Sequence, residues 1–329
     1  MGLRLTLACG DYDRTWALQD GAVVPEGIDL QYVALDPPVI FRRMLERGEW
    51  DASEMSFASY LITRGRGEDR FMAIPVFPSR VFRHSAVFIH EDSGIKAPQD
   101  LAGKRVGLPE YAMTAAVWVR GLLQHEYGVG PGQIRWLIGG LETPAPEEKI
   151  RFSLPPGVRL DSIPAGKTLS GMLEQGELDA LVSVKLPSPV ARRSPKVRRL
   201  FPDYQAAELD YYRKTGLFPI MHTVVLRQDV YEAHPWVAMS LYKAFVRAKA
   251  AAEARLTDTD AVRYMLPWMV AEAEELRVLS GGTWWPYGVE GNRKALETLV
   301  QYMVEQGLMP APLKPEQLFA PATLDEFRI

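Results

Sequence analysis

The chain has 329 residues, and at about 150 residues per domain this length predicts two domains. Apolar residues make up 47% and charged residues 24%, ordinary values for a soluble globular protein that exclude a disordered, collagen-like or coiled-coil chain. The net charge of −3 argues against nucleic acid as a partner, the single Cys9 excludes an intrachain disulfide or a multi-thiolate zinc site, and no apolar run reaches the ~18 residues of a membrane span.

The first ten residues predict a β-strand. Leu3, Leu5 and Leu7 alternate with polar residues, and a period of two places them on one face of a strand. The same stretch faintly resembles an export signal, but its apolar part is shorter than the roughly 7–15 residues that a signal needs, and charged residues follow at once. We therefore expect a cytoplasmic protein if the sequence is complete.

An internal repeat predicts the architecture. Residues 172–180 repeat residues 44–52 with seven of nine positions identical. Each copy reads as the end of an amphipathic helix, then a glycine that can take the left-handed C-cap conformation, then a buried strand. Before the first copy, Asp36 is placed to cap the helix and Pro37 suits its first turn. One copy in each half of the chain predicts two α/β lobes, each built around its own sheet.

Helices and strands alternate along the chain, which implies mostly parallel sheets. The clearest helices are residues 113–127, closed by Gly128, and residues 237–255. An aromatic loop at residues 283–288 is expected to pack between lobes or between subunits. Further strands are predicted at residues 28–35, 51–54, 71–76, 104–108 and 134–138.

Two apolar, β-rich segments are predicted to connect the lobes. They are residues 84–90 and 221–227, and as crossovers they divide the chain into lobe 1, residues 1–83 plus 222–329, and lobe 2, residues 84–221. The expected fold class is therefore α/β, a two-lobed clam-shell with a ligand cleft between the lobes. In open α/β sheets, ligands bind beyond the carboxyl ends of the strands.

That rule selects six candidate ligand-binding residues near the predicted strand ends. Arginine matches carboxylates in a bidentate manner and helix N-termini attract anions, so the set favours an acidic ligand. Plainer roles stay open: Arg14 as a surface ion pair, Thr114 as a helix cap, and Tyr111 as packing between the lobes. The six residues are Asp11, Arg14, Ser56, Arg80, Tyr111 and Thr114.

Three residues are candidates for proton transfer. His84 and His222 each open a predicted crossover strand and can reach the cleft floor, and histidine titrates near neutrality. Glu54 ends a strand, and is either a structural, hydrogen-bonded carboxylate or an acid whose pKa burial raises. No metal site is predicted, because Asp11, Asp13 and the two histidines lack a recognised metal-binding spacing, although a metal ion stays open. Nucleotide-binding glycine motifs and a serine nucleophile elbow are also lacking in the sequence.

Several segments together resemble the 4,5-dihydroxyphthalate decarboxylases, and the resemblance runs through nearly the whole chain. It is carried by residues 7–15 (LACGDYDRT), 77–80 (FPSR), 109–121 (PEYAMTAAVWVRG), 219–223 (PIMHT) and 285–288 (WPYG). The resemblance implies a type 2 periplasmic-binding-protein-like fold, in agreement with the clam-shell expected above. It also implies decarboxylation of 4,5-dihydroxyphthalate to protocatechuate and carbon dioxide by ring protonation, in bacterial phthalate degradation and without an organic cofactor. Relatives on this scaffold can act on other hydroxylated aromatic acids.

The resemblance suggests roles for the candidates. The two arginines and the helix start at Thr114 would hold the carboxylates, either histidine would supply the proton, and Glu54 or Tyr111 would engage the phenol. The expected partner is a small aromatic carboxylate, with neither nucleic acid nor membrane, and a homo-oligomer stays open. The alternative is a non-enzymatic solute-binding protein for a small aromatic carboxylate, because one fold can serve both functions.

Overall fold

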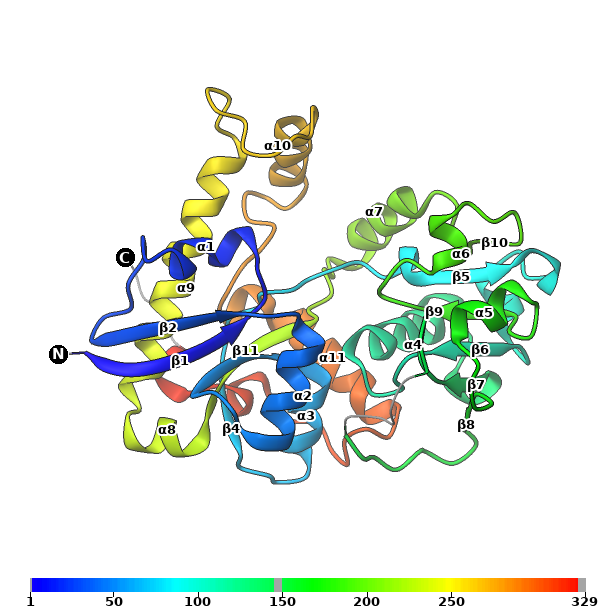
Figure 1. Ribbon diagram of the computed structural model, residues 1–329, viewed down its shortest axis with the longest axis horizontal. Coiled ribbons are helices and arrows are strands. Elements are labelled where there is room, and N and C mark those ends of the chain that lie inside the picture. The colour runs from blue at the N-terminus through cyan, green and yellow to red at the C-terminus, as the bar shows by residue number, and fades with distance from the viewer. Residues whose placement is uncertain (1, 145–149, 325–329) are drawn as a thin grey trace.

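The computed structural model describes residues 2–144 and 150–324, which form two lobes that lie end to end (Figure 1). Each lobe has its own β-sheet. Within the described residues, one sheet has five strands in the order β2-β1-β3-β11-β4, and the other has six in the order β10-β5-β9-β6-β7-β8. The predicted two-lobed α/β architecture is therefore confirmed.

The first sheet is built mainly from the N-terminal part of the chain. Strand β1 is parallel to β2 and β3, whereas β11, from much later in the sequence, is antiparallel to β3 and β4. Leu5 and Leu7 are buried on one face of β1, as their alternation predicts, and share a core with Val237 and Leu241. The strands are β1 (Leu3–Cys9), β2 (Ile28–Ala34), β3 (Ala52–Ser56), β4 (Phe71–Ile74) and β11 (His222–Arg227).

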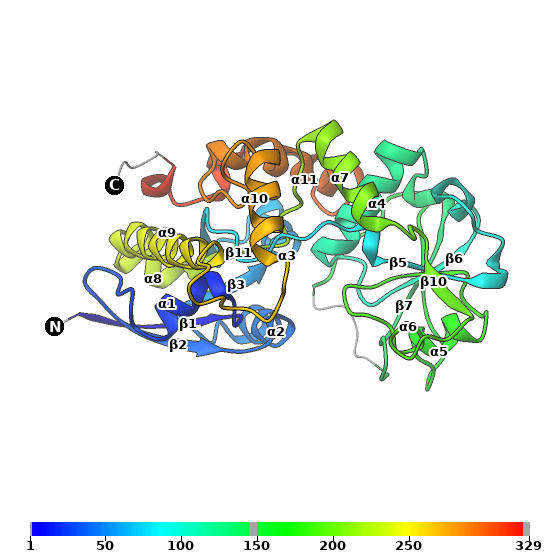
Figure 2. The same ribbon diagram turned by 90° about the horizontal axis from the view of Figure 1, so that it is seen from above.

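Helices cover this sheet on both faces (Figure 2). Helix α2 (Pro37–Arg47) ends at Gly48, whose φ of 59° is a left-handed conformation that favours glycine. Asp36 occupies the N-cap position as expected, but its side chain forms no capping hydrogen bond. The other helices of this lobe are α1 (Trp16–Gln19), α3 (Phe57–Gly65), α8 (Gln228–Ala233), α9 (Trp236–Leu256), α10 (Met269–Leu279) and α11 (Arg293–Glu305).

The second sheet repeats the helix–glycine–strand unit. Residues 172–180 run from a helix through Gly176 into β9, as residues 44–52 run through Gly48 into β3, and each strand pairs in parallel with a neighbour. The internal repeat thus marks equivalent units of the two lobes. The strands are β5 (Val87–His90), β6 (Arg105–Leu108), β7 (Arg135–Ile138), β8 (Arg159–Ser162), β9 (Ala180–Val182) and β10 (Val197–Arg199), and the helices are α4 (Thr114–Tyr127), α5 (Leu169–Glu174), α6 (Ser188–Ala191) and α7 (Tyr204–Thr215).

The connections between the sheets lie just before the segments that the sequence suggested. Residues 84–90 enter the second sheet as β5 and residues 221–227 enter the first as β11, so neither segment is itself the crossover. The chain instead crosses in the residues leading into these strands, where Arg80 and Ile220 form an antiparallel bridge. An apolar run predicts a strand, but it does not show which sheet the strand joins or where the chain crosses.

Helix α9 is 21 residues long and carries α10 away from the first sheet, toward α7 of the other lobe (Figures 1 and 2). No helix in the described ranges has both the length and the apolar character that a membrane crossing requires.

Candidate active site

A buried carboxylate and a histidine meet on adjacent strands of the first sheet. Glu54 lies on β3 and is fully buried, and His222 is the first residue of the antiparallel β11. His222 pairs with Ser56, two residues beyond Glu54, and because side chains alternate along a strand these residues share one face of the sheet. The His222 Nδ1 atom lies 2.6 Å from Glu54 Oε1.

Every neighbour of the Glu54 carboxylate favours its ionised form. Oε1 also accepts a hydrogen bond from the Tyr12 hydroxyl at 2.7 Å, and Oε2 accepts one from the Gly10 amide at 2.9 Å. Burial opposes ionisation most strongly, but the charge of His222 and the hydrogen bonds that the carboxylate accepts outweigh burial and lower the pKa of Glu54. The reading of Glu54 as an acid with a raised pKa is therefore wrong, because burial is compensated by donors on several sides.

This arrangement orients the His222 ring. Its Nδ1 faces Glu54, and its ring forms a T-shaped pair with Phe41, with the ring centroids 4.8 Å apart. The side chain keeps 18% of its surface exposed, whereas the Glu54 side chain has none. A carboxylate on Nδ1 fixes the ring and leaves Nε2 as the nitrogen that can exchange a proton with a ligand.

Arg14 lies beside this pair with its guanidinium group between two aromatic rings. The guanidinium carbon is 4.2 Å from the centroid of the Tyr12 ring and 4.4 Å from that of the Trp285 ring. Arg14 Nε donates to the Pro78 carbonyl at 2.6 Å, and Nη1 donates to the Asp13 carboxylate at 3.0 Å. These contacts hold the plane of the guanidinium, and Asp13 offsets part of its charge.

Arg80 is a buried cation without an anion. Only 5% of the surface of Arg80 is exposed. Its guanidinium donates hydrogen bonds to the carbonyls of Phe218 at 3.2 Å and Pro286 at 3.4 Å. Among the residues that the structure describes, its Nε has no hydrogen-bond partner and it forms no ion pair. Burial lowers the pKa of Arg80 to about 9, opposed by Tyr287 and Tyr212. Because an unpaired buried charge is costly, this guanidinium is the strongest candidate for binding an anionic ligand.

Ser56 and Thr114 join the two lobes. Their hydroxyl oxygens lie 3.0 Å apart, and Thr114 Oγ1 also accepts a hydrogen bond from the Ala58 amide at 3.0 Å. Thr114 begins α4 in one lobe, and Ser56 precedes α3 in the other. The Thr114 hydroxyl therefore satisfies a backbone donor at the start of α3, which is closer to the plainer role of a cap than to that of a free ligand donor.

Two predicted ligand residues do not reach the Glu54–His222 pair. Tyr111 is fully buried in the second lobe, where its ring stacks on Phe152 and lies under the Arg120 guanidinium. Asp11 is exposed and accepts a hydrogen bond from the Trp16 indole at 2.6 Å. Tyr111 follows a strand of the second sheet, and its side chain is buried in the core of that lobe. The position of a residue after a strand does not show whether its side chain is buried.

His84 packs in an aromatic cluster of the second lobe. Its ring lies 5.0 Å from that of Phe201 and 5.3 Å from that of Tyr211, and its Nδ1 has no hydrogen-bond partner in the described part of the chain. The structure therefore brings His222, and not His84, into contact with Glu54. His84 belongs to a core whose other rings are apolar or phenolic.

His84 is expected to make the protein sensitive to mild acid. Burial lowers the pKa of His84 to about 4, with the charge of Glu126 opposing this shift, whereas a histidine in the unfolded chain has a pKa of about 6.5. Between these values the unfolded chain binds a proton that the folded chain excludes, so stability falls as the pH falls through this window. We expect the Tm of His84→Phe to decrease less between pH 7 and pH 5 than the Tm of the unaltered protein, as measured by calorimetry. Equal losses in both proteins would contradict this assignment.

Two aromatic residues of the site were not among the predicted site residues. Tyr12 is two positions beyond the Gly10 that ends the first predicted strand, and Trp285 lies in the aromatic loop at residues 283–288, which was expected to pack between lobes. Trp285 donates its indole N–H to the Phe77 carbonyl at 2.8 Å and stacks on Arg14, and both of these partners belong to its own lobe. A strand-end rule that includes aromatic side chains as well as charged ones would have selected Tyr12.

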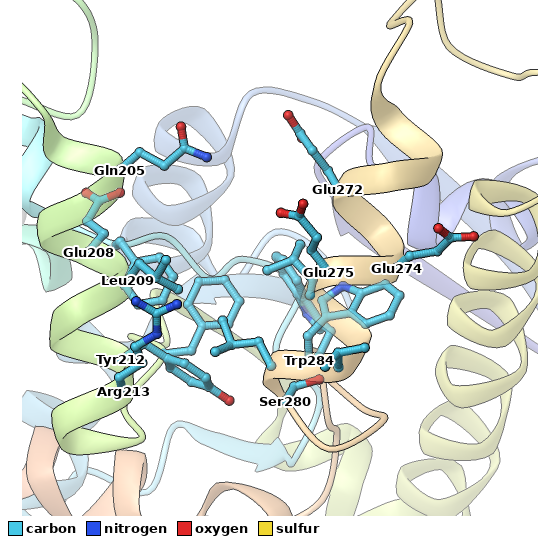
Figure 3. Close-up of a pocket in the computed structure, with 16 residues that line it drawn as sticks. Gln205, Glu208, Leu209, Tyr212, Arg213, Glu272, Glu274, Glu275, Ser280 and Trp284 are labelled. Atoms are coloured by element: carbon cyan, nitrogen blue, oxygen red, sulfur yellow. The ribbon is translucent and has the colours of Figure 1, made fainter.

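A cavity of about 800 Å³ lies between α7 and α10 (Figure 3). Phe218 and Trp285 line it, and these same residues contact Arg80 and Arg14. Glu54 and His222 are not part of its wall. The cavity therefore adjoins residues that contact the two arginines and does not include the Glu54–His222 pair.

Within the described residues, no three His, Cys, Asp or Glu side chains come together in a way that could hold a metal ion.

The chain forms two α/β lobes on separate sheets and crosses between them twice, and this arrangement defines the class of fold. The same fold is found in the aliphatic sulphonate binding protein SsuA of Escherichia coli, at a TM-score of 0.55 and 14% identity over 98% of this chain and 99% of that one. It is also found in the desulfurization enzyme DSZB, at a TM-score of 0.50 and 17% identity over 98% and 97% of the two chains. The fold is thus of the type 2 periplasmic-binding-protein kind, as the resemblance implied, and it occurs in a binding protein and in an enzyme.

Sequence comparison identifies the family. The family model described as NMT1/THI5 like matches residues 23–142. The chain is 42% identical to a 4,5-dihydroxyphthalate decarboxylase of Comamonas testosteroni over 327 residues, covering 99% of both chains. It is also 42% identical to one of Pseudomonas putida over 211 residues, 64% of this chain and 82% of that protein. This chain belongs to the 4,5-dihydroxyphthalate decarboxylase family.

Proposed function

We propose that this protein decarboxylates a hydroxylated aromatic diacid, 4,5-dihydroxyphthalate, to protocatechuate and carbon dioxide. The observation that carries the proposal is the Glu54–His222 pair, which Tyr12 links to Arg14, together with Arg80, a buried cation without an anion whose chain neighbour Ser79 accepts a hydrogen bond from the His222 amide. The reaction needs a proton donor next to a site for negative charge, and this arrangement supplies both. The names of the two relatives support the same substrate.

The chemistry requires one proton and no external electron acceptor. Each carboxylate of the substrate is para to a hydroxyl group, so protonation of the ring carbon that bears the departing carboxylate places positive charge where that hydroxyl oxygen stabilises it. His222 Nε2 gives up the proton and a new C–H bond forms. The C–C bond to the carboxylate then breaks, its electron pair restores the aromatic ring, and carbon dioxide leaves. The imidazole afterwards regains a proton from solvent.

Glu54 supports this step by positioning and charge. It accepts from Nδ1 while the proton leaves Nε2, and so stabilises the imidazolium before transfer. Both of its oxygens are already engaged by protein donors. We therefore assign Glu54 to His222 and not to the phenol of the substrate.

The two substrate carboxylates need different environments. The departing group must lose its charge as it becomes carbon dioxide, so an ion pair to it would stabilise the substrate over the transition state. The retained carboxylate keeps its charge throughout, and the unpaired Arg80 fits it best. Arg14, whose charge Asp13 partly offsets, is suited to orient the departing group without holding it tightly.

Arg80 should control substrate binding more than chemistry. We expect Arg80→Gln to raise KM for 4,5-dihydroxyphthalate by about 10- to 100-fold, the loss of a charge-assisted hydrogen bond, with a smaller change in kcat. Steady-state kinetics measures both, and inhibition by phthalate compared with benzoate reports the contact to a second carboxylate. Arg4→Gln is the matched control, since Arg4 is exposed and pairs only weakly with Asp29. An unchanged KM in Arg80→Gln would rule out Arg80 as the anchor.

The direct test is to incubate the purified protein with 4,5-dihydroxyphthalate and to measure carbon dioxide and protocatechuate. We expect equimolar products, and, because no step above calls for a metal or an organic cofactor, we expect activity to survive dialysis against EDTA. Tight binding without product would instead support the solute-binding alternative. The cytoplasmic location and the oligomeric state stay predictions, which cell fractionation and sedimentation test.

A further inference from the structure

The Tyr12 side chain contacts both halves of the candidate site. Its hydroxyl group donates to Glu54 Oε1 at 2.7 Å, the same oxygen that faces His222 Nδ1 at 2.6 Å. The face of its ring lies 4.2 Å from the guanidinium carbon of Arg14. The Tyr12 side chain thus connects the Glu54–His222 pair with Arg14.

The Tyr12 hydroxyl stays protonated and acts as a hydrogen-bond donor. Burial first, and then the charge of Glu54, raise the pKa of Tyr12 far above its usual value, so the hydroxyl keeps its proton. The carboxylate beside it stays ionised, and a protonated phenol can only donate to it. The other titratable or charged groups around the carboxylate are His222 from β11, Cys9 from β1, Tyr32 from β2 and Arg14 from the turn at Asp13–Thr15.

We infer that Tyr12 is a positioning residue that holds the Glu54–His222 pair and the Arg14 guanidinium in one fixed geometry. The Tyr12 hydroxyl and the His222 ring both contact Glu54 Oε1. By donating to this oxygen, Tyr12 weakens the attraction between the carboxylate and the imidazolium. By stacking on Arg14, it sets where the departing carboxylate rests relative to Nε2. The kinetic part of this inference rests on the proposed function, whereas the hydrogen-bonding part does not.

Tyr12→Phe separates the two roles, because it deletes the hydroxyl and keeps the ring. Without the hydroxyl, the carboxylate is less well solvated, so it binds its own proton more readily and holds the His222 proton more tightly. We expect both the acid and the alkaline limb of the pH profile of kcat/KM to move to higher pH, by about one pH unit, with KM unchanged. Tyr12→Leu also removes the ring, and we expect it to raise KM about threefold to tenfold as well.

Tyr32→Phe is the matched control. Tyr32 is also a buried phenol near Glu54, but its hydroxyl donates to the Gly10 carbonyl at 2.7 Å and does not touch the carboxylate. We expect its pH profile to keep both limbs in place. If Tyr12→Phe loses activity with its limbs unmoved, or if Tyr32→Phe shifts them equally, the inference is overturned.

A second measurement separates this inference from the proposed function. NMR of the ligand-free protein reports the hydrogen bond between His222 Nδ1 and Glu54, and we expect the ring nitrogen chemical shifts of His222 to change in Tyr12→Phe and not in Tyr32→Phe. A protein that releases no carbon dioxide but shows this change would refute the proposed function and keep the coupling. A protein that decarboxylates the substrate, with unchanged chemical shifts, would do the reverse.

Discussion

Replacement of His222 by asparagine is expected to lower kcat by about 10²–10⁴-fold, the usual contribution of a general acid. Asparagine keeps a polar side chain that can reach Glu54 but has no proton to give to a ring carbon. KM should change little, because in the proposed mechanism the arginines and not the imidazole hold the carboxylates. Steady-state kinetics with 4,5-dihydroxyphthalate measures both quantities.

The matched control is His84→Phe, which replaces the other candidate histidine within an aromatic cluster. We expect this variant to keep kcat near that of the unaltered protein. If His222→Asn is fully active, His222 is not the acid, and a large loss in His84→Phe with unchanged Tm would move the role to His84.

Glu54→Gln is expected to lower kcat by a similar factor, about 10²–10⁴-fold, because an amide neither stabilises the imidazolium nor holds the correct ring tautomer. The amide also presents an N–H₂ group to a site where Gly10, Tyr12 and His222 all direct donors toward the side chain. One unsatisfied buried donor should cost about 1–3 kcal/mol of stability, which chemical denaturation at pH 7 measures.

The pH dependence of stability gives a second readout for Glu54. Its pKa is lowered in the folded protein, so its ionised form stabilises the fold above the unfolded value of about 4.3, and this stability is lost as the pH falls toward the lower, folded value. Glu54→Gln should lose less stability than the unaltered protein across that acid range. A variant with normal turnover and the same acid sensitivity would show that the carboxylate is not ionised as described.

Local patterns were sufficient to predict most of the fold. Leucine alternation predicted β1, and the repeated glycine-punctuated unit predicted β3 and β9 in separate sheets. Strands β8 and β10 were missed. Both lie at sheet edges, and their residues (RLDS and VRR) are largely polar, so their backbone hydrogen bonds come from a neighbouring strand without an apolar pattern in their own sequence.

The site was only partly predictable, because its geometry depends on which strands pair. Both candidate histidines begin an apolar run, and only the antiparallel register of β11 on β3 shows that His222 lies beside Glu54. Similarly, Arg80 suggested a carboxylate ligand from the sequence alone. Only the folded chain shows that this arginine is buried without a counterion. The substrate was predicted from the resemblance to the family, because no side-chain pattern in the sequence specifies it.

The bridge between Arg80 and Ile220 links the two crossings of the chain. Ile220 is two residues from His222, so the cation proposed to anchor the substrate and the ring proposed to protonate it both lie close to where the chain crosses between the lobes. A rotation of one lobe against the other leaves points on its axis nearly still. If the lobes rotate about these crossings, Arg80 and His222 keep their spacing while the distant parts of the lobes move, and we expect product release to leave the proposed site intact.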